Sequence, residues 1–154
     1  MTDLKDKAGI REIVEGYGPD CKELMRYAAW LESKSGAKTV SEYDPNDGKG
    51  GTMMFPVYDG TLLNFVKTAD KLEHINRNYV YTYSKNRIRS EKDELELIDR
   101  AQITDMQLLF DILSSYILKG RTKGAVWSRG VENGVYLKLV TKMKDLIEFW
   151  TQPF

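Results

Sequence analysis

The chain has little of what most catalytic and metal sites need. Among its 154 residues there is one histidine, His74, and one cysteine, Cys21. A single cysteine cannot form an internal disulfide. Zinc sites need spaced sets of cysteine and histidine, which are missing. We therefore expect no metal and no cofactor, and a non-enzymatic role is favoured while an enzyme stays open.

Long apolar runs are also missing. No stretch approaches the 18 consecutive apolar residues typical of a membrane-spanning helix. The first residues carry charges at Asp3, Lys5, Asp6 and Lys7 instead of the apolar run of a signal peptide. With 42% hydrophobic and 30% charged residues, the composition is that of an ordinary globular chain. These features predict a cytoplasmic protein with no membrane partner and one helical domain over residues 1–154.

The spacing of apolar residues favours an all-α bundle of about six helices. The expected helices cover residues 4–15, 20–33, 61–74, 90–100, 105–118 and 135–150, with a shorter turn of helix around Trp127. Gly16-Tyr17-Gly18-Pro19 predicts a break after the first helix. The segment 105–118 is apolar around most of its circumference, so it is expected at the centre of the bundle. Ser90 with Asp93, and Thr104 with Gln107, are predicted capping boxes.

Two segments are less regular. Turn-forming residues at 44–51 predict a flexible loop rich in glycine and aspartate. The flanking segments Thr39–Tyr43 and Thr52–Phe55 could pair as a short β-hairpin around residues 39–57. Tyr79–Tyr83 has three tyrosines at a spacing of two, so both a strand and a short helix remain open there.

Positive charge is concentrated in residues 119–144. This segment has seven Lys or Arg and one acid, Glu132, although the whole chain is neutral. Such a segment could bind an anion or nucleic-acid phosphates. The candidate residues are Lys119, Arg121, Lys123, Arg129, Lys138 and Lys142. A solvated helix face is the alternative.

Within it, Gly120–Gly124 combines glycines with Arg121 and Lys123, which would suit a phosphate near a helix N-terminus. The loop lacks the P-loop pattern, and a helix end followed by a solvated loop is favoured.

A second basic stretch, from Arg77 to Arg89, is interleaved with aromatic residues. Its candidate contact residues are Arg77, Tyr79, Tyr81, Tyr83, Arg87 and Arg89. Tyrosine and arginine are typical anchors of protein–protein interfaces, and they can also stack on nucleic-acid bases. The isoelectric point near 6.6 is low for a dedicated nucleic-acid binder. The stretch therefore favours a protein partner.

Two catalytic alternatives are weaker. Cys21, near a predicted helix start, could form a nucleophile pair with His74, but capping or packing roles are favoured. The carboxylates Glu91, Asp93, Glu94 and Glu96 alternate with cations, so we expect a solvated helix face in preference to an acid–base cluster.

The order of several short motifs resembles a known family. The motifs are Phe55-Pro56-Val57-Tyr58, Ile103-Thr104-Asp105, Lys119-Gly120, and Trp127 followed by Val131-Glu132-Asn133-Gly134-Val135. From Met53 to Trp150 this order is similar to an uncharacterised bacterial family, the domain of unknown function numbered 6508. The family has no known activity, so the resemblance implies a helical fold and a bacterial or bacteriophage setting.

Three functional hypotheses follow. The first is a small non-enzymatic binding protein, an adaptor or inhibitor acting on a larger protein complex in a bacterium or bacteriophage. The second is a nucleic-acid-binding module that uses residues 119–144. The third is an enzyme or sensor that binds a phosphorylated small molecule at Gly120–Gly124. The sequence leaves the identity of the partner and the oligomeric state open.

Overall fold

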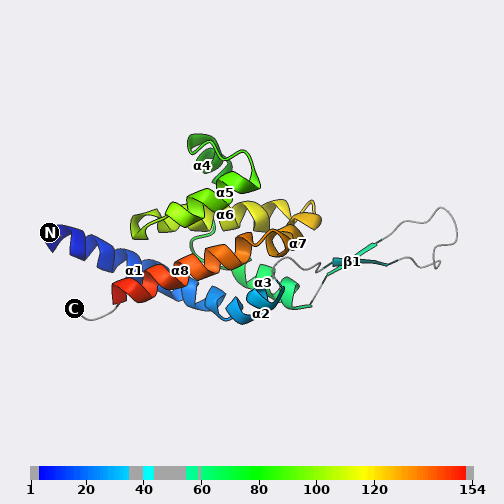
Figure 1. Ribbon diagram of the computed structural model, residues 1–154, viewed down its shortest axis with the longest axis horizontal. Helices are drawn as coiled ribbons and strands as arrows, with labels where there is room; N and C mark the ends of the chain where they lie inside the picture. Colours follow the sequence, from blue (N-terminus) through cyan, green and yellow to red (C-terminus); the bar gives the residue numbers. More distant parts are fainter. Residues whose placement is uncertain (1–3, 35–39, 44–54, 59, 152–154) are drawn as a thin grey trace.

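The computed structural model describes residues 4–34, 40–43, 55–58 and 60–151 (Figure 1). Within these residues there are eight α-helices, one 3₁₀ turn at Ile103–Asp105 and one pair of short strands. The helices are α1 (Leu4–Met25), α2 (Ala28–Lys34), α3 (Gly60–Asp70), α4 (Tyr79–Lys85), α5 (Glu91–Arg100), α6 (Met106–Lys119), α7 (Ala125–Glu132) and α8 (Val135–Thr151). The all-α class is confirmed, with eight helices where about six were expected.

The predicted break at residues 16–19 is wrong, because α1 continues through Pro19 and ends at Met25. A proline inside a helix removes one backbone hydrogen bond. Here α1 packs lengthwise against α8 (Figure 1). The side chains of Cys21 and Leu24 are fully buried. Burial of this apolar face offsets the lost bond. The chain turns instead at Arg26 and Tyr27, before α2.

The irregular segments also differ in detail from expectation. Strands β1 (Val40–Tyr43) and β2 (Phe55–Tyr58) pair antiparallel, with Tyr43 opposite Phe55. The second strand therefore begins where the predicted one ends, and the predicted loop at 44–51 lies outside the described residues. Tyr79–Tyr83, left open between strand and helix, is helical as part of α4.

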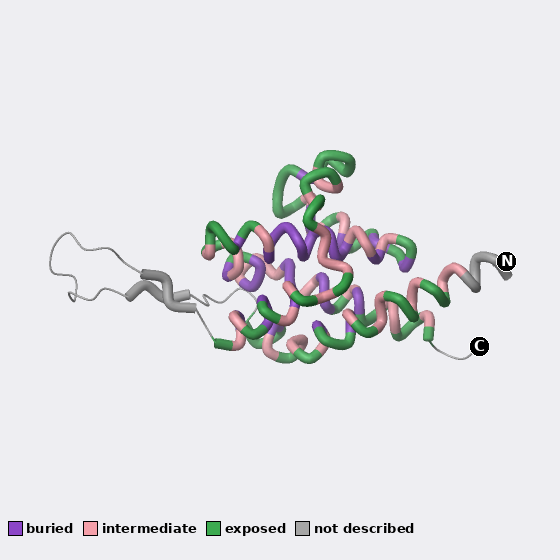
Figure 2. The backbone as a smooth tube through the Cα atoms, turned by 180° about the vertical axis from the view of Figure 1, so that it is seen from behind, coloured by how far each residue is buried: buried purple, intermediate pink, exposed green. Residues whose placement is uncertain are grey.

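Helix α6 lies at the centre, as its apolar circumference predicts. Every residue from Leu109 to Ile117 is buried, and α3, α4, α7 and α8 pack around it (Figure 2). The residues that cap the start of this helix are not the predicted pair, Thr104 and Gln107. Instead, the Gln102 backbone N–H donates to Asp105 Oδ2 at 3.0 Å. The predicted cap of α5 is confirmed, since Asp93 N–H donates to Ser90 Oγ at 3.2 Å.

Two glycines allow the last three helices to approach closely. A Cβ atom at Gly120 would lie 1.9 Å from Trp127 Cδ1, and one at Gly130 would lie 2.2 Å from Tyr136 Cζ. The Trp127 indole Nε1–H also donates to the Ile117 carbonyl at 2.9 Å. Gly120 thus leaves room for an indole ring at the end of α6, which is a packing role.

None of the helices in the described residues is long and apolar enough to cross a membrane.

Candidate functional site around helix α4

None of the residues of helix α4 is fully buried, and hydrogen bonds hold it to the bundle together with the Tyr83 ring, which packs against the core. Two neighbouring residues supply these bonds. Thr82 Oγ1–H donates to Asp111 Oδ2 at 2.7 Å, and Tyr83 O–H donates to Glu94 Oε2 at 2.5 Å. Hydrogen bonds to an ionised carboxylate are stronger than those between neutral groups. The helix is therefore fixed by two buried carboxylates, one on α6 and one on α5.

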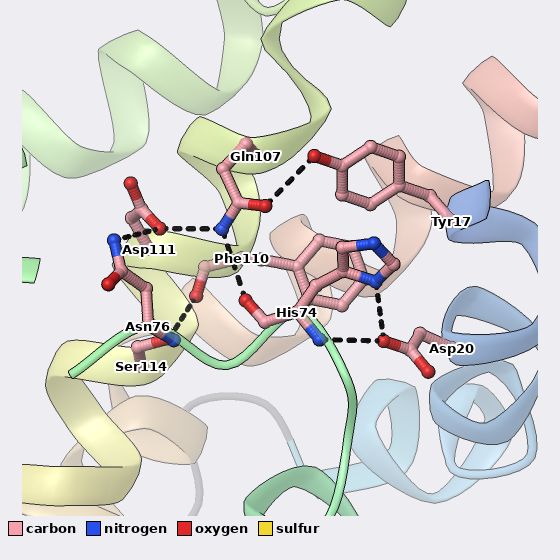
Figure 3. Close-up of polar contacts among 8 residues, drawn as sticks. All are labelled: Tyr17, Asp20, His74, Asn76, Gln107, Phe110, Asp111 and Ser114. Atoms are coloured by element: carbon pink, nitrogen blue, oxygen red, sulfur yellow. Dashed lines mark hydrogen bonds and ion pairs between the residues drawn. The ribbon is translucent and has the colours of Figure 1, made fainter. Parts of the chain in front are cut away.

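The first carboxylate belongs to what we term the Asp111 cluster: Asp111, Asn76, Thr82 and Gln107. Figure 3 shows Asp111, Asn76 and Gln107. Asp111 is 4% exposed. Besides Thr82, Asn76 Nδ2 and Gln107 Nε2 donate to its Oδ1 at 3.1 and 2.8 Å. Gln107 also donates to the His74 carbonyl at 3.1 Å and accepts from Tyr17 O–H at 2.8 Å. The cluster joins α1, α4 and the segment before α4 to the central helix.

His74 and Cys21 do not form the nucleophile pair considered from the sequence. His74 Nδ1 lies 2.7 Å from Asp20 Oδ2, and the imidazole stacks on Tyr17 with ring centroids 3.9 Å apart (Figure 3). Cys21 lies well inside α1 and not at a helix start. Burial, and then the charge of Asp20, raises the pKa of its thiol to about 12. The thiol stays protonated at neutral pH, so it is a poor nucleophile.

The second carboxylate belongs to the Glu94 cluster: Glu94, Tyr83, Ser115, Tyr116 and Asn133. Tyr116 O–H donates to Glu94 Oε1 at 2.6 Å, opposite the bond from Tyr83. Ser115 Oγ lies 2.6 Å from the Tyr83 oxygen, and Asn133 Nδ2 donates to the Tyr116 oxygen at 3.0 Å. Glu94 is 6% exposed. The expectation that the acids of this helix form a solvated face is therefore wrong for Glu94.

Both tyrosines of the Glu94 cluster have pKa values raised above the ordinary value of 10.0. Burial is the largest cause for each, and the charge and hydrogen bond of Glu94 raise the pKa values further. The two hydroxyls therefore remain protonated donors at neutral pH.

A cavity of about 260 Å³ opens beside Glu94. Its lining residues are Tyr83, Ile88, Arg89, Ser90, Glu91, Glu94, Ser115, Tyr116, Lys119, Val126 and Arg129. Two of them, Tyr83 and Arg89, come from the predicted basic–aromatic stretch, and Lys119 and Arg129 come from the predicted basic segment. The two sets were predicted as separate surfaces, and the fold brings members of both to one cavity.

The cations of this cavity have weak partners. Lys119 Nζ lies 5.4 Å from the Tyr83 ring centroid and 5.8 Å from that of Tyr79. Arg129 Nε lies 4.0 Å from Glu91 Oε1, at the limit of an ion pair.

The other cations of the predicted anion-binding set are directed elsewhere. Arg121 pairs with Asp70 of α3. Lys138 Nζ donates to Asp99 Oδ2 at 2.8 Å, and Lys142 Nζ donates to the Asp99 carbonyl at 2.9 Å. Lys123 is exposed but does not line the cavity. The six residues therefore do not act as one patch, and two of them fasten α8 to the end of α5.

The outer face of α4 exposes apolar surface. Tyr81 and Val80 are 72% and 64% exposed, and α4 stands at the edge of the helices (Figures 1 and 2). A hollow of about 650 Å³ lies there, lined by Asn76, Arg77, Asn78, Val80, Tyr81 and Thr82. Of the predicted contact residues, Arg77, Arg87 and Arg89 are exposed, Tyr79 is half-buried and Tyr83 faces the cavity. Residues 76–90 contain four cations and no acid.

Asp111 and Tyr116 were not predicted as site residues, and Glu94 was considered only as part of the disfavoured acid–base cluster. One signal was present for Glu94: it precedes the buried Ile98 by four residues, so both lie on the same helix face. For Asp111, the signal was an acid within an otherwise apolar helix, since such an acid must find hydrogen-bond donors.

Within the described ranges, no three histidine, cysteine, aspartate or glutamate side chains gather in a way that could hold a metal ion. No family model, curated protein or solved structure matches this chain, so the resemblance noted above stays a prediction.

Proposed function

We propose that this protein is a non-enzymatic adaptor or inhibitor that binds an acidic face of another protein through the outer face of α4. One observation carries the proposal. Val80 and Tyr81, adjacent on a helix without any buried residue, leave most of their apolar surface exposed. Tyrosine and arginine are enriched among the residues that anchor protein interfaces, and Arg77 lines the same hollow as Val80 and Tyr81.

The side of α4 opposite the proposed contact face is hydrogen-bonded to the bundle. Val80 and Tyr81 precede Thr82 and Tyr83 by two residues each, which is about half a helical turn. The hydroxyls of Thr82 and Tyr83 bind the two buried carboxylates, so Val80 and Tyr81 face away from the bundle. A helix fixed in this way loses little conformational freedom when a partner binds, and this favours affinity.

Charge defines the kind of partner. Arg77 lines the same hollow as Val80 and Tyr81, and residues 76–90 contain three further cations and no acid. Charges at the rim of an interface mainly accelerate association with an oppositely charged surface, and salt screens them. The partner is therefore expected to present acidic residues around an apolar pocket that accepts Tyr81.

Affinity capture from nuclease-treated lysate tests the proposal with matched aromatic variants. Tyr81→Ala removes the proposed anchor, whereas Phe149→Ala removes another exposed aromatic side chain, on α8 and 56% exposed. We expect wild type and Phe149→Ala to capture the same protein, and Tyr81→Ala to bind it at least about tenfold more weakly. Arg77→Glu should slow association at low salt and have a smaller effect at high salt.

Two outcomes would contradict this function. Capture that Tyr81→Ala leaves unchanged would exclude α4 as the contact face. Capture that disappears with nuclease would instead support the nucleic-acid hypothesis for residues 119–144, and Lys123→Glu would then reduce it.

A further inference from the structure

Three cations, Arg89, Lys119 and Arg129, and two acids, Glu91 and Glu94, line the cavity, so positive charge is in excess. The cations come from the segment before α5, from α6 and from α7. In the part of the chain that the structure describes, Arg89 and Lys119 have no ion pair, and Arg129 is only 4.0 Å from Glu91. Cations held around a concave surface raise the local concentration of anions.

The start of α5 adds to this charge. Ser90, the N-cap residue, and Glu91, the first helical residue, both line the cavity. The N-terminus of a helix carries a partial positive charge and unpaired backbone N–H groups. Its contribution has the same sign as that of the three side-chain cations, and the acids Glu91, Asp93 and Glu94 of the first turn partly offset it.

The inner end of the cavity has different chemistry. Each oxygen of Glu94 accepts one tyrosine hydroxyl, and a carboxylate oxygen has room for a second donor. Ser115 and Tyr116 place further hydroxyl oxygens on the same wall. Hydroxyl groups of a ligand would find acceptors here, whereas a second anionic group would be repelled by Glu94.

We propose that this cavity binds a small phosphorylated molecule that also carries hydroxyl groups. Arg89, Lys119 and Arg129 bind the phosphate, and Glu94 accepts hydrogen bonds from the hydroxyls. A phosphate monoester, with a charge near −2 at neutral pH, matches several cations better than one carboxylate does. The volume of about 260 Å³ is at or below the lower end of small-molecule pockets, so the ligand is small.

This site is separate from the proposed docking face, because the two lie on opposite sides of α4. It is also separate from the loop Gly120–Gly124, since Arg121 pairs with Asp70 and Lys123 does not line the cavity.

Titration calorimetry at low ionic strength tests the proposal with four probes: glycerol 3-phosphate, inorganic phosphate, glycerol and succinate. We expect glycerol 3-phosphate to bind most tightly, inorganic phosphate more weakly, and the other two not measurably. Lys119→Ala and Arg89→Ala should each weaken binding of glycerol 3-phosphate about tenfold or more. Lys123→Ala removes a neighbouring exposed lysine outside the cavity and should leave binding unchanged.

Glu94→Gln tests the contacts to the ligand hydroxyls separately from the contacts to its phosphate. It should lower the preference for glycerol 3-phosphate over inorganic phosphate, because the ligand hydroxyls lose one acceptor oxygen while both phosphates benefit equally from the lost negative charge. Circular dichroism confirms that each variant is folded, and Lys119→Arg should restore most of the affinity.

The proposal is overturned if neither phosphate compound binds, if succinate binds more tightly than glycerol 3-phosphate, or if Lys119→Ala and Lys123→Ala have equal effects. Tyr81→Ala should not alter this binding, so failure here leaves the docking proposal standing, and the reverse also holds.

Discussion

The Asp111 and Glu94 clusters are the two places where a buried carboxylate binds α4 to the bundle. Each contains a buried carboxylate that accepts hydrogen bonds from neutral groups, and each receives one of them from α4. The exposed fractions of Asp111 and Glu94 are nearly equal, at 4% and 6%. Their surroundings differ, because only Glu94 borders a cavity with cations around it.

The difference separates a structural cluster from a candidate binding site. The three donors to Asp111 come from α4, α6 and the segment before α4, so removing the carboxylate would leave three groups without their acceptor. Beside Glu94 there is room for water or a ligand to replace a missing partner. Burial of an acid alone therefore does not mark a binding site, whereas an acid beside an accessible cavity is a candidate for one.

Among the substitutions that test this comparison, the largest expected effect is the change in the free energy of unfolding when either carboxylate is removed. Asp111→Ala leaves three donors unpaired, and we expect the free energy of unfolding to fall by about 3 kcal/mol. Glu94→Ala should cost about half as much, because water can enter the adjacent cavity. Urea unfolding monitored by circular dichroism measures both values.

Asp111→Asn provides the control for the first variant. Its amide oxygen can still accept from Asn76 and Gln107, and the Thr82 hydroxyl can turn to accept, so the loss should be only about 1 kcal/mol. Equal losses for Asp111→Ala and Glu94→Ala would remove the distinction between the two clusters.

Alkaline pH should act on the Glu94 cluster and also on Tyr136 and Cys21, whose pKa values are likewise raised by burial. The pKa values of Tyr83 and Tyr116 are raised in the folded state, so above pH 10 the unfolded state has lost protons that the folded state retains. The stabilisation is complete below pH 10 and is lost as pH rises beyond it, by about 1.4 kcal/mol per pH unit for each tyrosine. Unfolding measured across this range should show the decline.

The matched variants for this prediction are neighbours on α4. Tyr83→Phe removes a titrating hydroxyl and should make the decline shallower. Thr82→Val removes a hydroxyl that does not titrate, so it should lower stability by about 1 kcal/mol at every pH without changing the slope. Equal slopes in wild type and Tyr83→Phe would contradict the raised pKa of Tyr83.

The smallest expected change in stability concerns the buried hydroxyl of Tyr136. Tyr136 O–H is fully buried and has no hydrogen-bond partner among the described residues, although its ring packs beside Tyr116. Tyr136→Phe should leave stability unchanged or raise it by about 1 kcal/mol, since no bond is lost and an unpaired polar group is removed. A loss of more than 1 kcal/mol in thermal or urea unfolding would indicate a partner for this hydroxyl.

Much of the helical framework could be predicted from the sequence. The apolar circumference of 105–118 predicted the central helix, and Ser90 predicted the start of α5. Both signals are local, because helix periodicity and capping depend on residues within a few positions of each other. The predicted break at residues 16–19 was wrong, because burial of Cys21 and Leu24 outweighs the backbone hydrogen bond that is lost at Pro19.

The candidate site was only partly visible in the sequence. Charge patterning identified Arg89, Lys119 and Arg129 as cations of interest, but it could not show that they meet. It also grouped Lys138 and Lys142 with them, although both bind Asp99. Ion pairs between residues that are distant in the sequence depend on how helices pack.

The sequence by itself determined the all-α class, the central helix and the two regions rich in positive charge, because these follow from periodicity and composition. Only the tertiary structure decided which charges are neutralised within the protein and which remain available around the cavity. It also decided that Glu94 and Asp111 are buried. The physical reason is that desolvation and hydrogen bonding of a polar group depend on neighbours that packing supplies from other elements.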